Sequence, residues 1–239
     1  MTIKLLQWNI SFQEKVKNIH RLIRDISPDI ITLQEVASDT ESNKGIHVAE
    51  ELNERLGWNY VFVPEIVPSF PGKEVGNMII SKYPITDHES IDLIQGEPTE
   101  AVSTKVYLEA TIDLEGLELH VGTTHITYDA KYHPTEQRTM EEEKLREILK
   151  QKESNYIFTG DLNNKPSSIF ITELSKQFKN AGPAFEYNTA NTKNENWKHR
   201  DPSHRIDYVF TTNEIAVRKA KTVATEFSDH LPILVDLDF

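Results

Sequence analysis

The first 36 residues alternate a strand pattern, a helix pattern and a second strand pattern, and this order constrains the fold more than any other feature. Residues 3–10 (IKLLQWNI) form a short apolar run of the kind found in buried strands. Between Glu14 and Ser27, apolar side chains recur at helical spacing. Pro28 ends that helix, and residues 29–36 (DIITLQEV) have the composition of a strand. Because a strand–helix–strand opening is typical of an α/β layer, we expect an α/β protein.

The remainder of the chain contains more strand patterns than helix patterns. Further helices are predicted at 46–56, 134–150 and 168–178. Further strands are predicted at 58–63, 76–81, 102–113, 117–125, 155–159, 206–211, 215–224 and 231–237. The helix at 134–150 carries several glutamates, which we interpret as a solvated face. Since the sequence has no internal repeat, linker or change in composition, we predict one domain spanning residues 1–239.

Charge and composition exclude several classes of protein. The formal net charge is −12, so the overall electrostatic field disfavours polyanions. A phosphate-bearing substrate must then be held locally, by a bound cation or by a few placed basic residues. The absence of cysteine excludes disulfides and thiolate metal sites. No apolar stretch approaches the ~18 residues of a membrane span, and the N-terminus has the pattern of a first strand, so we expect a cytoplasmic protein without membrane association.

Short polar groups occur where the predicted strands end. They are Trp8-Asn9, Gln34-Glu35, Thr124-His125, residues 160–163 (GDLN) and Ser228-Asp229-His230. Each has an ordinary explanation when taken singly, because a polar residue at a strand end is usually a turn residue or a cap. Glu35 can be a solvated edge residue, and His125 a hydrogen-bonded structural histidine. Together they indicate a site, because α/β folds gather strand ends at one edge of the sheet.

The residue types in this set favour one kind of chemistry. Hard oxygen ligands without cysteine suit Mg²⁺, Mn²⁺ or Ca²⁺ better than zinc. Two histidines supply groups that donate hydrogen bonds or protons near neutral pH. A bound divalent cation also provides the local positive charge that an acidic chain lacks. The set is therefore typical of an enzyme that hydrolyses phosphate esters.

Seven short motifs, taken in order, resemble those of the endonuclease/exonuclease/phosphatase superfamily. They are WN (8–9), LQE (33–35), GNMIISKYPI (76–85), TH (124–125), GDLN (160–163), RIDYVF (205–210) and SDH (228–230). The motifs extend over nearly the whole chain, and the resemblance rests on the ordered set rather than on any single triplet. It implies a four-layer α/β sandwich, in which two mixed β-sheets pack face to face with helices outside. It also implies a divalent-metal-dependent phosphodiester hydrolase with Mg²⁺ or Mn²⁺ as cofactor.

The resemblance further implies a role for each matched residue on the metal and water side. Glu35 is similar to the principal metal ligand of the family, with Asn9 beside it contacting the metal or the phosphate and Asp229 as a further metal-side carboxylate. Asp161 is similar to the residue that orients or deprotonates the attacking water. Asn163 is similar to the residue that hydrogen-bonds a phosphate oxygen.

Three other matched residues imply contacts with the phosphate. His230 is similar to the histidine that contacts the scissile phosphate, and Asp207 to the carboxylate that fixes its ring. His125 is similar to a second histidine that stabilises charge on the phosphorane or assists the leaving group. The TH form that contains it is typical of branches similar to pancreatic-type deoxyribonuclease and tyrosyl-DNA phosphodiesterase 2.

The substrate is less constrained by the sequence. Candidate substrate contacts are Arg138, Lys165, Trp197 and Arg200. The segment 183–204 interleaves basic and aromatic residues, as a stacking platform for unpaired bases does, although a solvated loop with its Trp packed on the core fits equally well. We predict nucleic acid as the substrate, as ends or single strands. The alternative is a phosphatase or phosphodiesterase of a small or lipid-derived phosphoester, which the net charge fits slightly better.

A scaffold that only binds a phosphorylated partner is a third hypothesis. It requires the loss of at least one of Glu35, Asp161, Asp207 and His230, and all four are present.

Overall fold

Two six-stranded sheets form the centre of the molecule. The computed structural model describes residues 1–66, 74–94, 104–129, 135–191 and 204–239. The first sheet contains β1 (Thr2–Asn9), β2 (Ile30–Ala37), β3 (Asn59–Glu65), β4 (Val75–Ser81), β11 (Ala216–Thr222) and β12 (Ile233–Asp238), in the order β11-β12-β1-β2-β4-β3. The second contains β5 (Ile85–Asp92), β6 (Val106–Leu114), β7 (Leu117–His125), β8 (Tyr156–Asp161), β9 (Lys179–Asn180) and β10 (Asp207–Thr211), in the order β5-β6-β7-β8-β10-β9. Both sheets are mixed, since β1–β2 and β7–β8 are the parallel pairs among antiparallel ones.

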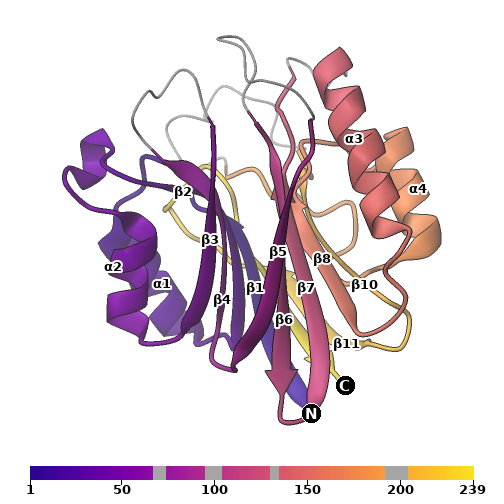
Figure 1. The fold of residues 1–239 in the computed structure, drawn as a ribbon, viewed down its shortest axis with the longest axis horizontal. Helices are drawn as coiled ribbons and strands as arrows, with labels where there is room; N and C mark the ends of the chain where they lie inside the picture. Colours follow the sequence, from indigo (N-terminus) through magenta and orange to yellow (C-terminus); the bar gives the residue numbers. More distant parts are fainter. Residues whose placement is uncertain (67–73, 95–103, 130–134, 192–203) are drawn as a thin grey trace.

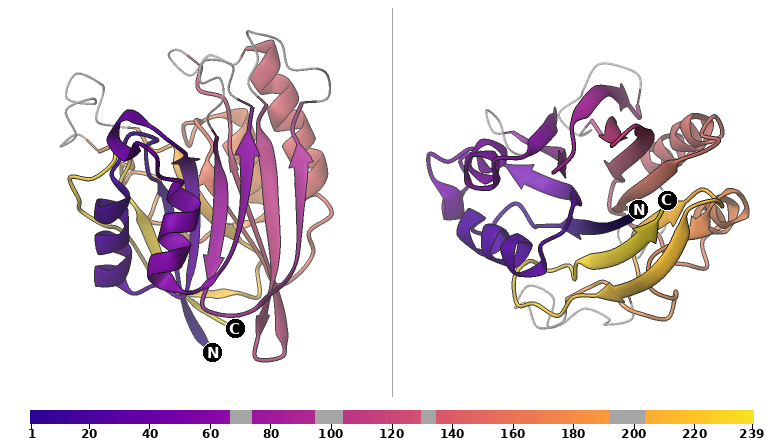
Figure 2. Two further views of the ribbon diagram at one scale, coloured as in Figure 1. Left: turned by 60° about the vertical axis from the view of Figure 1, so that its left-hand side comes forward. Right: turned by 90° about the horizontal axis from the view of Figure 1, so that it is seen from below.

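Helices cover the outer faces of the two sheets. Figure 1 shows α1 (Val16–Ile26) and α2 (Val48–Leu56) beside the first sheet, and α3 (Glu136–Leu149) and α4 (Ile169–Gln177) beside the second. The end-on view in Figure 2 shows the same order of layers, with helices on both outer sides. A short 3-10 helix, η1 (Glu41–Asn43), precedes α2. This arrangement confirms the predicted four-layer α/β sandwich. Within the described ranges, no helix is both long enough and apolar enough to cross a bilayer.

The core explains why the strands have continuous apolar runs instead of strict alternation. Leu5 and Ile30 point between the sheets and pack in one cluster with Val121 and Ile157 of the second sheet. Leu6, next along β1, faces outward and packs against α1 in a separate cluster. A strand buried on both faces needs apolar residues at successive positions, each contributing about 1.5–3 kcal/mol through burial of its side chain.

Most of the predicted elements are found, and two strands of the structure have no counterpart among the predictions. The strand β5 has the sequence ITDHESID and is exposed at most of its positions, so the alternation that marks a half-buried strand is weak there. The strand β9 contains only two residues. The expected solvated face of the helix at 134–150 is wrong in part, because Arg138 and Glu141 are buried.

Both sheets place their polar strand ends at the same edge of the sandwich. The strands β1, β2, β7 and β8 end at this edge, which is the upper one in Figure 1, and their antiparallel neighbours β10 and β12 begin there. In β10, for example, Asp207 lies directly opposite Asp161 of β8. At this edge Nε1 of Trp8 donates to the backbone oxygen of His230 at 3.0 Å, although the two residues are 222 positions apart in the sequence.

Candidate active site

A cavity of about 490 Å³ opens at this edge between the two sheets. Six of the residues predicted from the sequence line it, namely Glu35, His125, Asp161, Asn163, Asp229 and His230. Four further residues complete its described wall, namely Phe12, Lys105, Thr127 and Tyr128. Its volume lies within the range of about 300–1,000 Å³ that is usual for small-molecule sites.

A bulge in β2 presents Glu35 to the cavity. The register between β2 and β4 shifts between Leu33 and Val36, and Glu35 has a φ of 57° in the left-handed region. A non-glycine residue in this region costs about 1–3 kcal/mol, so the surrounding contacts must hold it. They do so through the carboxylate, which accepts hydrogen bonds from Asn9 Nδ2 at 3.1 Å and from the Phe12 backbone N–H at 3.1 Å.

Asn9 joins the carboxylates of the two sheets. Its Nδ2 donates to Glu35 Oε1 and also to Asp161 Oδ2 at 3.0 Å, while its Oδ1 accepts from the Ser11 backbone N–H at 3.0 Å. Asn9 thus holds two acidic side chains close together. In this geometry its amide oxygen accepts one hydrogen bond from the backbone, and its nitrogen faces the two carboxylates.

Asp161 lies at the centre of the site and is almost completely buried. Burial and the neighbouring charge of Asp207 raise the pKa of Asp161 to about 7, although His230 and two hydrogen bonds act in the opposite direction. Its Oδ2 lies 3.6 Å from Nε2 of His125 and 3.6 Å from Nε2 of His230. A carboxylate with such a pKa can accept a proton near neutral pH.

His230 and Asp207 form a buried pair. Nδ1 of His230 lies 2.9 Å from Oδ2 of Asp207, which fixes the ring and leaves Nε2 directed toward Asp161. Burial alone would lower the pKa of His230, but the charges of Asp207 and Asp161 outweigh it and raise this pKa well above its ordinary value. His230 is therefore an imidazolium at neutral pH.

His125 has the opposite charge state. Burial and the positive charges of Lys105 and His230 lower its pKa well below the ordinary value, so it is a neutral imidazole. Its Nε2 lies 3.3 Å from Nδ2 of Asn163. The site therefore combines a neutral histidine, a cationic histidine and a carboxylate within 3.6 Å of both rings.

The helix α3 braces this arrangement from behind. Arg138 donates from Nη2 to the backbone oxygen of Asn163 at 2.6 Å and from Nε to Glu142 at 3.1 Å. Glu142 also accepts from Asn164 Nδ2 at 2.9 Å. Arg138, predicted as a substrate contact, is only 1% exposed and does not belong to the described wall of the cavity. Its position is internal because the carbonyl of Asn163, a residue with a φ of 46°, needs a partner inside the protein.

Replacing Arg138 with methionine is expected to lower kcat about 10- to 100-fold and to change KM much less, because the loop that carries Asn163 loses its support. Steady-state kinetics with any phosphoester that the protein hydrolyses measures kcat and KM separately and checks this prediction. The variant Arg138→Lys keeps a charge and a donor and should recover part of kcat. A rise in KM alone would instead restore the role in substrate contact.

Of the other predicted substrate contacts, only Lys165 belongs to the described residues. Lys165 is partly buried in the loop that follows Asn164 and does not line the cavity. Trp197 and Arg200 lie outside the described residues.

Lys105 is the functional candidate that sequence reasoning missed. It lies just before β6 and forms an ion pair of 2.8 Å with Glu65, at the end of β3. The two residues are 40 positions apart, and they come together because the first sheet, which contains β3, packs on the second, which contains β6. The sequence signal that could have indicated Lys105 is a lysine at the start of a buried strand in an otherwise acidic chain.

The donor set is suited to a divalent cation. Burial and the nearby charge of Asp229 raise the pKa of Glu35, so two carboxylates repel each other beside the cavity. A hard cation would relieve this repulsion. The buried group Asp161, Asp207 and His230 also has ligand atoms within 4.8 Å of one another and could hold a metal ion. Glu35 and Asp229, the ligands predicted from the sequence, line the same cavity.

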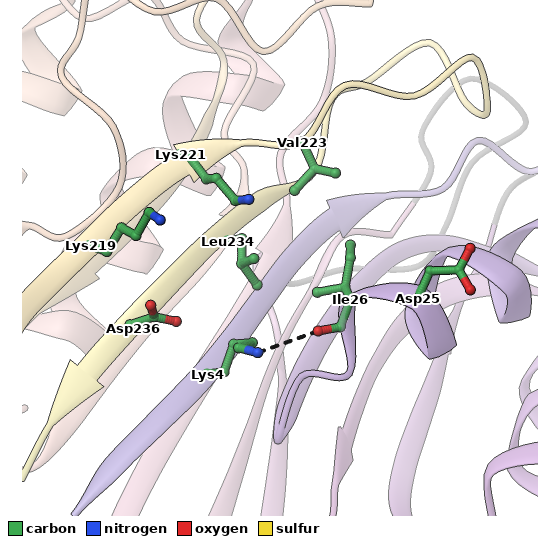
Figure 3. Close-up of a pocket in the computed structure, with 8 residues that line it drawn as sticks. All are labelled: Lys4, Asp25, Ile26, Lys219, Lys221, Val223, Leu234 and Asp236. Atoms are coloured by element: carbon green, nitrogen blue, oxygen red, sulfur yellow. Dashed lines mark hydrogen bonds between the residues drawn. The ribbon is translucent and has the colours of Figure 1, made fainter.

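A second cavity, of about 300 Å³, lies on the outer face of the first sheet and is separate from this site (Figure 3). Lys4, Lys219 and Lys221 line it together with Asp25 and Asp236, and Lys4 donates to the backbone oxygen of Ile26 at 3.4 Å. Lys4 and Lys219 both lie opposite Asp236 in register, so opposite charges neutralise one another across the strands. This cavity contains none of the predicted site residues.

Buried acids and histidines gathered at one edge of an α/β sandwich are side chains suited to the hydrolysis of phosphate esters. The chain belongs to the Endonuclease/Exonuclease/phosphatase family, since the model of that family matches residues 6–230. The resemblance stated from the motifs is thereby confirmed. No curated protein matches the sequence.

Solved structures show the same fold at low sequence identity. An endonuclease/exonuclease/phosphatase from Beutenbergia cavernae is 20% identical with a TM-score of 0.77, over 99% of this chain and 71% of that one. A mannosyl-6-phosphatase from Bacteroides thetaiotaomicron is 16% identical with a TM-score of 0.72, over 99% and 100%. TDP2 from C. elegans is 18% identical with a TM-score of 0.70, over 99% and 75%. At these identities the likeness establishes the fold alone.

Proposed function

We propose that this chain is a divalent-metal-dependent phosphoester hydrolase in which Asp161 activates the attacking water. The observation that carries the proposal is the position of Asp161. It is buried with a pKa of about 7, between a neutral and a cationic histidine, and Asn9 links it to Glu35.

The residues of the site then have separate tasks. Glu35 and Asp229 hold Mg²⁺ or Mn²⁺, which supplies Lewis-acid polarisation of the phosphate when bound. Asp161 accepts a proton from water as the water attacks phosphorus. His230, kept protonated by Asp207, donates from Nε2 to a non-bridging oxygen. His125 is neutral and can donate a hydrogen bond to the leaving oxygen. Asn163 is the proposed contact to a phosphate oxygen; its Nδ2 donates to the backbone oxygen of Ile126 at 2.9 Å and lies 3.3 Å from Nε2 of His125.

The pH dependence of kcat/KM follows from these charge states. Asp161 must be ionised, so activity is expected to rise as the pH increases through about 7, or through a lower value when a bound cation stabilises the carboxylate. His230 must be protonated, so activity is expected to fall as the pH passes its raised pKa. A bell-shaped profile measured at saturating Mg²⁺ checks this, and Asp207→Asn should move the alkaline limb to lower pH. An alkaline limb unmoved by that change would contradict the pairing.

Two substrate classes follow from the sequence, and both are compatible with this chemistry. Phosphodiesters at nucleic-acid ends or in single strands are supported by the aromatic rings of Phe12 and Tyr128 in the cavity wall, on which a base can stack. TDP2 has the same fold. Small phosphoesters are favoured by the net charge of −12 and by the presence of just one lysine in the described wall, which is no extended basic groove. The mannosyl-6-phosphatase has the same fold.

A substrate panel tests the proposal directly. Rates would be compared in Mg²⁺, Mn²⁺ and EDTA on single-stranded DNA, a recessed duplex, a 5′-phosphotyrosyl oligonucleotide, oligo-A RNA, p-nitrophenyl phosphate and bis-p-nitrophenyl phosphate. We expect EDTA-sensitive release from at least one of them. Turnover of a small ester alone would exclude nucleic acid as substrate. Equal turnover in EDTA would contradict the metal-dependent mechanism.

A further inference from the structure

A buried ion pair forms part of the cavity wall. Lys105 Nζ lies 2.8 Å from Glu65 Oε2, and the two side chains are 11% and 2% exposed. Asn77 on β4 donates from Nδ2 to Glu65 Oε1 at 3.1 Å and to the backbone oxygen of Val106 at 3.0 Å. Three segments from both sheets therefore fix the lysine beside the cavity.

Stability alone is a weak reason for such a pair. Taking two charges out of water offsets most of their mutual attraction, and apolar residues of similar volume often serve as well or better. A buried pair whose cation lines the same cavity as Asp161 and His230 is better explained by a task for that cation. The carboxylate of Glu65 then serves to position it.

The ammonium group of Lys105 is charged and retains donors. Burial alone would lower its pKa, but Glu65 outweighs burial through its charge and its hydrogen bond and raises it, so the group stays protonated. An ammonium group has three N–H donors. Within the described part of the chain, one of them is used, on Glu65. The others remain for a ligand in the cavity.

The number of anionic oxygens distinguishes phosphate monoesters from phosphate diesters. In an in-line displacement at phosphorus, three oxygens lie in the equatorial plane. In a phosphate monoester all three are unsubstituted and share two negative charges, whereas in a diester one of them carries a second organic group. A metal held by Glu35 and Asp229 would neutralise charge on one of these oxygens, and Nε2 of His230, in the same cavity wall, can donate to a second. Lys105 is the remaining cation in the described wall.

We propose that Lys105 contacts this third oxygen and makes the site selective for phosphate monoesters, that is, for a terminal phosphate. The inference rests on the proposed function and names its substrate class. A charged donor at this position stabilises a dianionic phosphoryl group and gives no matching contact to the ester group of a diester. Bond breaking is unchanged: water forms the new P–O bond, the bond to the leaving oxygen breaks, and Asp161 takes the proton.

The test compares two esters with the same chromophore, p-nitrophenyl phosphate and bis-p-nitrophenyl phosphate. Lys105→Met is expected to lower kcat/KM for the monoester by about 10- to 100-fold, the effect of losing one charged hydrogen bond, and for the diester by less than about 3-fold. Lys105→Arg should keep most of the preference for the monoester.

A matched double variant separates this role from a structural one. Glu65→Gln with Lys105→Met removes both charges, so no buried charge is left without a partner. It is expected to fold and to show the same selective loss as Lys105→Met alone. Equal loss on both esters, or no loss on the monoester, would overturn the proposal.

A binding measurement keeps this result separate from the outcome for the proposed function. In Mg²⁺, calorimetry with inorganic phosphate and with dimethyl phosphate should show that Lys105→Met weakens binding of phosphate only. If the wild-type protein hydrolyses neither ester, the proposed function fails, and phosphate binding still decides the role of Lys105. Phosphate binding that is absent in the wild type, or unchanged in Lys105→Met, would refute that role.

Discussion

Replacing Asp161 with asparagine is expected to reduce kcat by about 10²- to 10⁴-fold, which is the usual contribution of a positioned general base. Asparagine has nearly the same shape and can still accept the Asn163 backbone N–H that now bonds Oδ1 at 3.0 Å. It cannot take a proton from water. KM should change little, because the cations that bind the phosphate remain in place.

The same substitution has a second consequence, which concerns stability. Burial and Asp207 raise the pKa of Asp161 to about 7 in the folded protein. A carboxyl group whose pKa is higher in the folded state than in the unfolded state weakens folding increasingly as the pH rises from its unfolded value toward about 7. Asp161→Asn removes this effect, so the melting temperature of the metal-free variant should fall less than that of the wild type as the pH rises to 8.

Kinetics and thermal melting on the same samples check both results. Asp87→Asn on the exposed strand β5 is the matched control, because it also replaces a carboxylate with an amide, at a residue that does not line the cavity. Full turnover of Asp161→Asn at pH 8 would remove the proton-accepting role. An equal fall in melting temperature with rising pH in the variant and in the wild type would show that the charge of Asp161 does not weaken folding.

The layers of the fold could be predicted because both faces of the central strands are buried. Residues such as Leu5 and Leu6 point to opposite sides, yet both are apolar, and this pattern identifies strands enclosed between helices and a second sheet. The strand β5 lacks that signal because it lies at a sheet edge and is mostly exposed. The order in which the strands pair could not be predicted from the sequence, since it depends on contacts between distant segments.

The candidate site was predictable to the extent that it follows from strand ends. Polar residues that end or begin buried strands gather at one edge, and this rule brought out Glu35, Asp161 and His230. It could not reveal Lys105, whose partner Glu65 lies on another strand. The prediction of Arg138 as a substrate contact assumed that a charged residue on an acidic helix is exposed. Here Arg138 is buried and holds the carbonyl of Asn163.

Backbone strain is the feature of the site that no motif indicated. Ser11, Glu35, Asn163 and Ser228 all have φ between 46° and 59°, and all lie on segments that surround the cavity. None is glycine, so hydrogen bonds must fix each conformation, as Asn9 and the Phe12 N–H do for Glu35. The segments at this edge are thus held in one geometry before any ligand binds, which is the condition for electrostatic stabilisation of a charged transition state.

Glu35→Ala is expected to abolish metal-dependent activity, with a loss of about 10³-fold or more, because Glu35 is the principal carboxylate available to a cation beside Asp229. Its pKa is raised by burial and by Asp229, so the unliganded site contains repulsion that a divalent cation relieves. A metal that binds only the folded protein stabilises it by about 2.7 kcal/mol at a concentration of 100 Kd. For a chain of this length we therefore expect Mn²⁺ to raise the wild-type Tm by about 5–11 °C.

The variant should show neither the activity nor the shift in Tm, while it should still unfold cooperatively without metal. That combination separates loss of a ligand from loss of folding. Glu50→Ala, on the exposed side of α2, is the control and should retain both responses. A Mn²⁺ shift of full size in Glu35→Ala would place the cation elsewhere, and the buried group Asp161, Asp207 and His230 would then be the remaining set of ligands in the described residues.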